Sequence, residues 1–203
     1  KVKTDKYDVK KARKEILEIE SRVERFSRHI KYTISPEELD KFPELKIEGL
    51  KENLLAECHS DYLATWFAPH SLLEMLYYRR LIPYYKNKDL LRVLLSRAVR
   101  SSRLVPHYDL ATPKSPLPVK KEYWCRKHNR YCTPIDNCIS KIHAYSEDTA
   151  RRIAEFSMLR SDKVVKVIQG DSRTINLKKS LANTLIKNRL IDGIITSPPY
   201  VGQ

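Results

Sequence analysis

A turn near the end of the chain has the residue types needed to hold a flat, hydrogen-bonding ligand. Ser197-Pro198-Pro199-Tyr200 directly follows the largely apolar run of residues 190–196. Two consecutive prolines cannot continue a β-sheet, because neither has an amide hydrogen, and each keeps the preceding residue extended. We therefore expect a rigid turn that presents the Ser197 hydroxyl, the Pro198 carbonyl and the Tyr200 ring. The two oxygens suit an exocyclic amino group, and the ring suits stacking on a planar heterocycle.

A second group combines cysteine and histidine at close spacing. Thiolates and imidazoles are the usual ligands of tetrahedral zinc. Residues 125–143 contain enough of them for one ion: Cys125, Cys132 and Cys138, with His128 or His143 as the fourth ligand. The preferred set is Cys125, His128, Cys132 and Cys138. This spacing is not that of a standard zinc finger, so thiols without a metal are the alternative.

The charge of the chain predicts a polyanionic partner. The 203 residues carry a net charge of +14, which is typical of nucleic-acid-binding proteins, although a basic solvated surface gives the same composition. No stretch is long and apolar enough to span a membrane, and no apolar signal sequence opens the chain. Four cysteines without a secretion signal favour a reducing compartment, so we expect a cytoplasmic protein with free or metal-bound thiols.

The positive charge is concentrated in one part of the sequence. Between residues 92 and 132 there are ten Lys and Arg residues and two acidic residues. Three of the arginines recur at three-residue steps and so share one face of a helix or its end. With two lysines and nearby tyrosines they form a candidate clamp for DNA backbone phosphates, the alternative being a solvated basic face. The predicted DNA-binding residues are Arg97, Arg100, Arg103, Lys114 and Lys120.

The elements that must position these groups are mainly helical up to residue 160. Apolar residues at three- and four-residue steps predict a helix over residues 9–30. Further helices are expected from Ser35-Pro36, from Pro69 until Pro83 interrupts it, over residues 89–101, and from a cap at Ser146 to about residue 160. The proline-rich residues 105–122 read as irregular. Core positions are expected at Trp66, Phe67, Met75 and Leu76.

The last forty residues read differently. Short β-branched runs at residues 164–168 and 192–196 predict two strands, with a helix over residues 177–188 between them. A strand, a helix and a strand at this spacing predict a parallel βαβ unit with a right-handed crossover. Ligands gather at the carboxyl ends of such strands, where Asp171 and the Ser197–Tyr200 turn follow.

The Ser-Pro-Pro-Tyr turn resembles the catalytic motif of the S-adenosylmethionine-dependent DNA amino-methyltransferases, which methylate cytosine N4 or adenine N6 of a flipped base. The resemblance implies that Ser197 and the Pro198 carbonyl hold the amino nitrogen while Tyr200 stacks on the base. Pro199 would stiffen the turn. A serine in the first position of the motif is more usual among cytosine-N4 enzymes, which favours N4-methylcytosine over N6-methyladenine as the product.

The resemblance extends upstream and implies a fold. The segment "VIQGDSRTI" resembles the preceding strand of the family, and Asp171 matches the acid that lies near the cofactor adenine. Three segments between residues 96 and 160 resemble parts of methylases with a long insert before the catalytic motif. The implied fold is α/β: a partial Rossmann-like core with a mostly helical, basic insert. Residues 1–34 would be a core helix, 35–160 the insert, and 161–203 the catalytic βαβ unit.

The chain also departs from the family. It has four glycines, none close enough to another to form the glycine-rich cofactor loop. We therefore expect an internal piece, or one chain of a natural split enzyme, that is inactive alone. The implied cofactor is S-adenosylmethionine. The implied partners are DNA, the remaining part of the methyltransferase and a companion restriction enzyme. The alternatives are a non-catalytic nucleic-acid-binding piece and an RNA amino-methyltransferase.

Overall fold

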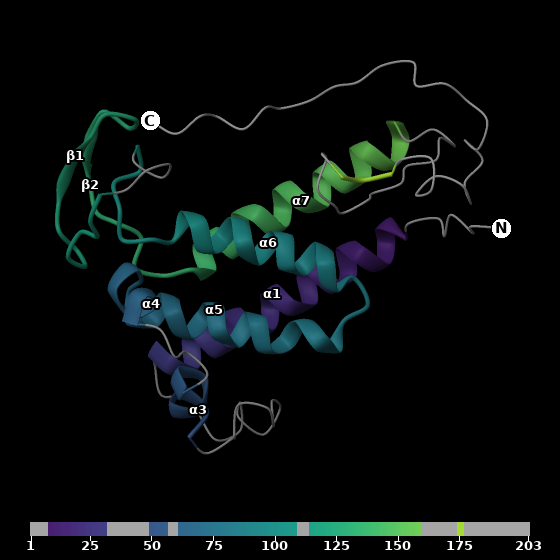
Figure 1. Cartoon of the computed structure of the whole chain (residues 1–203), viewed down its shortest axis with the longest axis horizontal. Helices are drawn as coiled ribbons and strands as arrows, with labels where there is room; N and C mark the ends of the chain where they lie inside the picture. Colours follow the sequence, from purple (N-terminus) through teal and green to yellow (C-terminus); the bar gives the residue numbers. More distant parts are fainter. Residues whose placement is uncertain (1–7, 32–48, 57–60, 109–113, 160–173, 177–203) are drawn as a thin grey trace. The chain divides into compact units, whose positions relative to one another are not determined.

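The structure of the chain is a computed structural model that describes residues 8–31, 49–56, 61–108, 114–159 and 174–176 (Figure 1). The chain divides into two units, residues 1–160 and 161–203, and the helices and strands below lie in the first. The predicted βαβ unit and the helix start at Ser35-Pro36 fall outside the described residues. So do five predicted site residues, which stay predictions: Asp171, Ser197, Pro198, Pro199 and Tyr200.

Helix α1 (Val9–Lys31) buries one face and exposes the other. Its buried face is a stripe of apolar side chains at steps of three and four residues, which matches the 3.6-residue turn of an α-helix. Asp8 caps the first turn, because its Oδ1 accepts the backbone N–H of Lys11 at 2.9 Å. The helix predicted over residues 9–30 is confirmed. The fully buried side chains of the stripe are Ala12, Ile16, Ile19, Val23 and Phe26.

Helix α5 (Pro69–Leu81) lies at the centre of the core and is buried around most of its circumference. It begins at Pro69 as predicted, since a proline in the first turn loses no helical hydrogen bond. The short 3-10 helix η2 (Ile82–Tyr84) follows, and it contains Pro83. The short helices α3 (Leu50–Ala56) and α4 (Asp61–Trp66) pack against α5. Of the predicted core residues, Phe67, Met75 and Leu76 are buried, and Trp66 packs partly buried against them.

Helix α6 (Lys88–Ser101) confirms the helix predicted over residues 89–101. Its start is tied to α1 by Glu15, whose carboxylate accepts the backbone N–H groups of Lys86 at 3.2 Å and Asn87 at 2.8 Å. Burial alone would raise the pKa of Glu15, but these hydrogen bonds outweigh it and hold the pKa below its usual value.

Helix α7 (Ile139–Leu159) begins well before the predicted cap at Ser146, which is buried inside the helix. The prediction was wrong because the cap comes from another element. Glu74 of α5 is fully buried, and its Oε2 accepts the backbone N–H groups of Cys138 and Ile139, the latter at 2.8 Å. A carboxylate at a helix N-terminus satisfies otherwise unpaired N–H groups.

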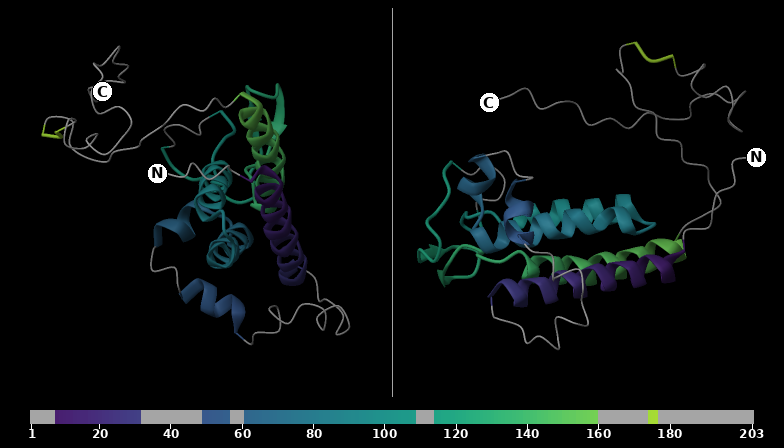
Figure 2. Two further views of the ribbon diagram at one scale, coloured as in Figure 1. Left: turned by 90° about the vertical axis from the view of Figure 1, so that its right-hand side faces the viewer. Right: turned by 90° about the horizontal axis from the view of Figure 1, so that it is seen from below.

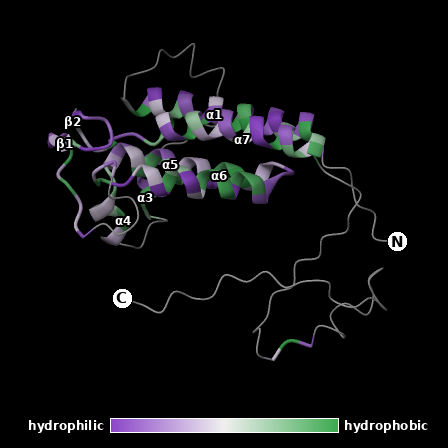
Figure 3. Cartoon of the chain, turned by 90° about the horizontal axis from the view of Figure 1, so that it is seen from above, coloured by the Kyte–Doolittle hydropathy of each residue, from purple (hydrophilic) through white to green (hydrophobic). Residues whose placement is uncertain are grey.

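Helices α1 and α3 to α7, referred to below as the helical body, share one apolar core. Helix α1 packs against α5 and α7, and α6 packs against the same two helices. Figures 1 and 2 show α1 and α7 side by side. Hydrophobic and hydrophilic segments alternate along α1 and α7, as expected for helices that bury one face (Figure 3). Helix α1 lies in the stretch predicted to belong to the methyltransferase core, residues 1–34, and it forms one body with the helices between residues 50 and 159.

The strands of the described residues are β1 (Tyr123–Cys125) and β2 (Arg130–Cys132), which pair antiparallel (Figure 1). This hairpin was not predicted. The described part of residues 105–122 contains neither helix nor strand, as predicted. Where the structure describes the chain, the fold is therefore helical with one small antiparallel sheet. No helix of that part has the length and apolar character needed to cross a membrane.

Candidate functional site

The hairpin places two cysteines on one face and two aromatic rings on the other. Its register pairs Trp124 with Tyr131 and Cys125 with Arg130. Because side chains alternate along a strand, Cys125 and Cys132 share a face. Trp124 and Tyr131 stand on the opposite face with their rings 5.4 Å apart, edge to face, and both are exposed.

The turn between the strands returns His128 to the two sulfurs. The backbone N–H of His128 donates to the Cys125 carbonyl at 3.2 Å, and Asn129 takes a left-handed backbone conformation with φ 49°. The Nδ1 atom of His128 consequently lies 3.6 Å from the Cys125 sulfur and 3.5 Å from the Cys132 sulfur.

A fourth potential ligand, His107, comes from the segment that leaves α6. The buried residues Leu104 and Val105 anchor this segment, and the Leu104 N–H donates to the Trp66 carbonyl at 2.9 Å. The backbone N–H of His107 donates to the Tyr123 hydroxyl at 2.9 Å. Its Nδ1 atom lies 3.8 Å from the Cys125 sulfur. Burial, followed by the neighbouring positive groups, lowers the pKa of His107.

These four residues form a compact cluster of potential metal ligands. One atom from each of His107, Cys125, His128 and Cys132 lies within 4.8 Å of every other. Sequence reasoning missed His107 because it is separated from Cys125 by a proline-rich segment and belongs to no spacing motif. A histidine within the predicted irregular segment, residues 105–122, was the one available signal.

Cys138 does not join this cluster, and the predicted ligand set is corrected accordingly. Its side chain is fully buried in the main core beside α5. Burial, followed by the charge of Glu74, raises the pKa of the Cys138 thiol to about 12. Because its sulfur does not belong to the group of converging ligand atoms and packs in the core instead, this cysteine is a core residue.

His143 also lies elsewhere. Its Nδ1 is 2.6 Å from Glu20 Oε1 on α1, and its Nε2 is 3.5 Å from Glu147. The hydrogen bond to Glu20 and the charge of that carboxylate raise the pKa of His143. His143 therefore joins α7 to α1.

Arg97, the first of the predicted DNA-binding residues, makes contacts within the helical body. Its guanidinium lies 2.7 Å from Asp148 and 3.2 Å from the Thr149 hydroxyl, and it stacks 4.4 Å above the Tyr145 ring. Asp148 also binds Arg151 and Arg152. The Arg97 guanidinium, followed by Arg152, holds the pKa of Asp148 well below its usual range. Arg97 thus links α6 to α7.

The other predicted DNA-binding residues differ in their surroundings. Arg103 is half-buried and donates from Nε to the Arg100 carbonyl, whereas Arg100 is exposed. Among the described residues, no carboxylate lies within ion-pair distance of the exposed cations between residues 114 and 130. We call residues 114–132 the basic hairpin. Its exposed cations are Lys114, Lys120, Lys121, Arg126, Lys127 and Arg130.

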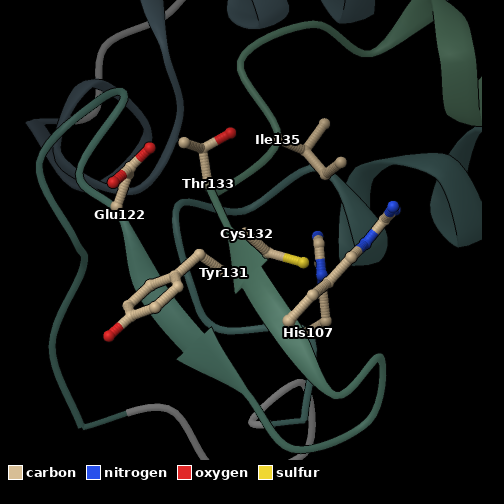
Figure 4. Close-up of a pocket in the computed structure, with 7 residues that line it drawn as sticks. His107, Glu122, Tyr131, Cys132, Thr133 and Ile135 are labelled. Carbon is tan, nitrogen blue, oxygen red and sulfur yellow. The ribbon is translucent and has the colours of Figure 1, made fainter.

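An open depression of about 360 Å³ borders the cluster, and its lining includes His107, Glu122, Tyr131 and Cys132. Figure 4 shows the sulfur of Cys132 close to the His107 ring, with Tyr131 and Glu122 on the far side of the depression. The cluster thus lies at the edge of an open surface, and three of its four residues belong to the basic hairpin.

The chain is similar in sequence to a protein named as a methyltransferase. Over its whole length, the chain is 31% identical to the Type II methyltransferase M.MjaII of Methanocaldococcus jannaschii. The chain spans 47% of that protein, so it corresponds to about half of its relative. No family model matches the chain. No solved structure matches it either.

Proposed function

We propose that this chain is part of an S-adenosylmethionine-dependent DNA amino-methyltransferase. The observation that carries the proposal is the Ser-Pro-Pro-Tyr motif, residues 197–200, in a chain that resembles a Type II methyltransferase over its full length. Neither observation alone is specific, because a proline-rich turn has many uses and a relative can have lost its activity. Together they favour transfer of a methyl group to an exocyclic amino group.

The motif supplies the groups that such a transfer needs. The Ser197 hydroxyl and the Pro198 carbonyl accept hydrogen bonds from the base amino group, which keeps its lone pair directed at the methyl donor. Tyr200 stacks on the extruded base, and Pro199 keeps the turn rigid. Asp171 is proposed to lie beside the adenine of S-adenosylmethionine. The serine in first position favours cytosine N4 over adenine N6 as the acceptor.

The basic hairpin is proposed as the main DNA-contacting surface. Its exposed cations, which no carboxylate of the described residues pairs, suit backbone phosphates, and the exposed Trp124 and Tyr131 rings suit contacts to sugars or unstacked bases. Arg100, Lys114 and Lys120 extend this surface. Arg97 is a weaker candidate, because the Asp148 carboxylate already compensates its charge.

A methyl-transfer assay tests the proposal. The protein, alone and with any companion chain encoded beside it, is incubated with S-adenosylmethionine labelled with tritium in its methyl group. Duplex DNA and RNA are supplied as separate substrates. We expect label in DNA, and nucleoside analysis of the digest then distinguishes N4-methylcytosine from N6-methyladenine. Label in RNA alone would overturn the proposed substrate.

Two variants make the assay specific to the motif. Ser197→Ala removes one acceptor of the amino hydrogens, and Tyr200→Ala removes the stacking ring, so both are expected to lower kcat by at least about 100-fold. Tyr200→Phe keeps the ring and serves as the matched control. DNA binding without any methyl transfer, unchanged by these variants, would support a non-catalytic binding piece.

A further inference from the structure

We propose that His107, Cys125, His128 and Cys132 bind one structural Zn²⁺ ion that fastens the basic hairpin to the helical body. This inference is independent of methyl transfer and would hold if the chain were only a nucleic-acid-binding piece. It also differs from the spacing-based ligand set, because His107 takes the place of Cys138.

The separations within the cluster match a tetrahedral site. Zinc bonds of about 2.3 Å to sulfur and about 2.05 Å to nitrogen place each sulfur about 3.6 Å from each nitrogen. In the structure, the His128 Nδ1 atom lies 3.5 Å from the Cys132 sulfur and 3.6 Å from the Cys125 sulfur. The His107 Nδ1 atom lies 3.8 Å from the Cys125 sulfur. One potential ligand atom from each of the four residues lies within 4.8 Å of the other three. The three sulfur–nitrogen separations are therefore close to those that one tetrahedral ion requires.

The chemistry of the ligands favours zinc over the hard cations. Two thiolates and two imidazoles are soft or borderline donors, whereas Mg²⁺ and Ca²⁺ prefer oxygen. Binding releases the two thiol protons to water, and the resulting Zn²⁺–dithiolate centre has no net charge. A neutral centre can be accommodated beside Cys125, which is fully buried.

The hairpin has little else to hold it in place. Each strand is three residues long, and Cys125 is the one fully buried residue between positions 123 and 132. A short isolated hairpin is marginally stable in water. Small elements without an apolar core are usually stabilised by disulfides or metals, and Cys125 and Cys132 are free thiols. A metal centre explains why so few apolar contacts suffice.

A catalytic thiol is the competing interpretation of a cysteine beside a histidine. Cys125 has no exposed surface, so a substrate cannot reach its sulfur. A catalytic thiol needs a single base beside it. Here both sulfurs lie beside the same His128 nitrogen, and the His107 imidazole lies beside the Cys125 sulfur as well. Convergence of all four residues on one point indicates a metal site.

Metal content and ligand type are measured on the intact chain. Elemental analysis after purification with zinc in the medium is expected to give one Zn²⁺ per chain. X-ray absorption at the zinc edge is expected to show two sulfur and two nitrogen neighbours. Replacement by Co²⁺ should produce the intense visible bands of a tetrahedral site with thiolate ligands. A chain that binds no zinc, or a shell dominated by oxygen, would overturn the proposal.

Variants identify the ligands. Cys132→Ser and His128→Asn are expected to lose the bound metal or weaken zinc affinity by at least 100-fold. Cys138→Ala and His143→Asn are the matched controls and should keep one zinc per chain. His128 is exposed and outside the main core, so its variant should keep the helical circular dichroism signal. Full zinc retention in both ligand variants, or its loss in the Cys138 control, would refute this ligand set.

Discussion

The helical body and the basic hairpin are stabilised in opposite ways. The body buries apolar side chains of every main helix, and its carboxylates Glu74 and Asp148 are hydrogen-bonded or ion-paired within it. The hairpin buries one cysteine and leaves six cations unpaired within the described residues. A region that binds a polyanion keeps its positive charges free of internal partners. In the hairpin, the proposed zinc site takes the place of the missing apolar core.

Because the two regions are stabilised differently, substitutions in them are expected to change different properties. Substitutions in the body are expected to act mainly on the free energy of unfolding. Substitutions in the hairpin are expected to act mainly on DNA affinity and metal content. Four measurements test this division.

The largest effect on stability is expected for Glu74→Ala. The substitution leaves the backbone N–H groups of Cys138 and Ile139 and the Ser27 hydroxyl without their buried acceptor. Each unpaired buried group costs about 1–3 kcal/mol, so a total loss of about 3–5 kcal/mol is expected in urea unfolding followed by circular dichroism. Ser27→Ala, which removes one donor, should cost about 1 kcal/mol. A loss below about 1 kcal/mol for Glu74→Ala would show that this cap does not hold α7.

The next effect concerns DNA binding by the hairpin. Lys120→Ala combined with Lys127→Ala should lower the slope of log affinity against log salt by about 2, because two phosphate contacts are lost. Arg100→Ala should lower it by about 1. Arg97→Ala is the control from the body: it should change the slope less, and it should lower the stability slightly by releasing Asp148. An unchanged slope in the double variant would place the DNA surface elsewhere.

Zinc removal should loosen one region and spare the other. In a Trp66→Phe background, the fluorescence of Trp124 reports on the hairpin alone, since the chain has two tryptophans. A chelator is expected to shift this emission while the free energy of unfolding of the helices changes by less than about 0.5 kcal/mol. Simultaneous melting of the helices on chelation would mean that the hairpin and the body fold as one unit.

The smallest effect is the pH dependence from His143 and Glu20. The pKa of His143 is raised in the folded chain, so the protonated pair stabilises the fold below the ordinary histidine pKa of about 6.5. That contribution is lost as the pH rises through the folded pKa. For this exposed pair it should be less than about 1 kcal/mol. The stability difference between the chain and His143→Ala should therefore shrink from pH 6 to pH 9, and a constant difference would exclude this linkage.

The sequence by itself determined the features that depend on neighbours along the chain. The apolar stripe of α1 follows from the helical repeat, and the start of α5 follows from Pro69, because these signals act within a few residues. The cysteine and histidine spacing likewise pointed to Cys125, His128 and Cys132. The Ser-Pro-Pro-Tyr motif is also local, and its placement is a prediction that lies outside the described residues.

Only the tertiary structure decided the features that join distant residues. Glu74 caps a helix that begins 65 positions later, as its bond to Ile139 shows, so no local pattern could have placed the start of α7. A lone glutamate in the apolar run of α5 was the available signal. The predicted ligand Cys138 was wrong and His107 was missed for the same reason. Burial in the core and the path of a proline-rich segment determine which side chains meet. Spacing describes the chain in one dimension, whereas a metal site requires four atoms to converge in three.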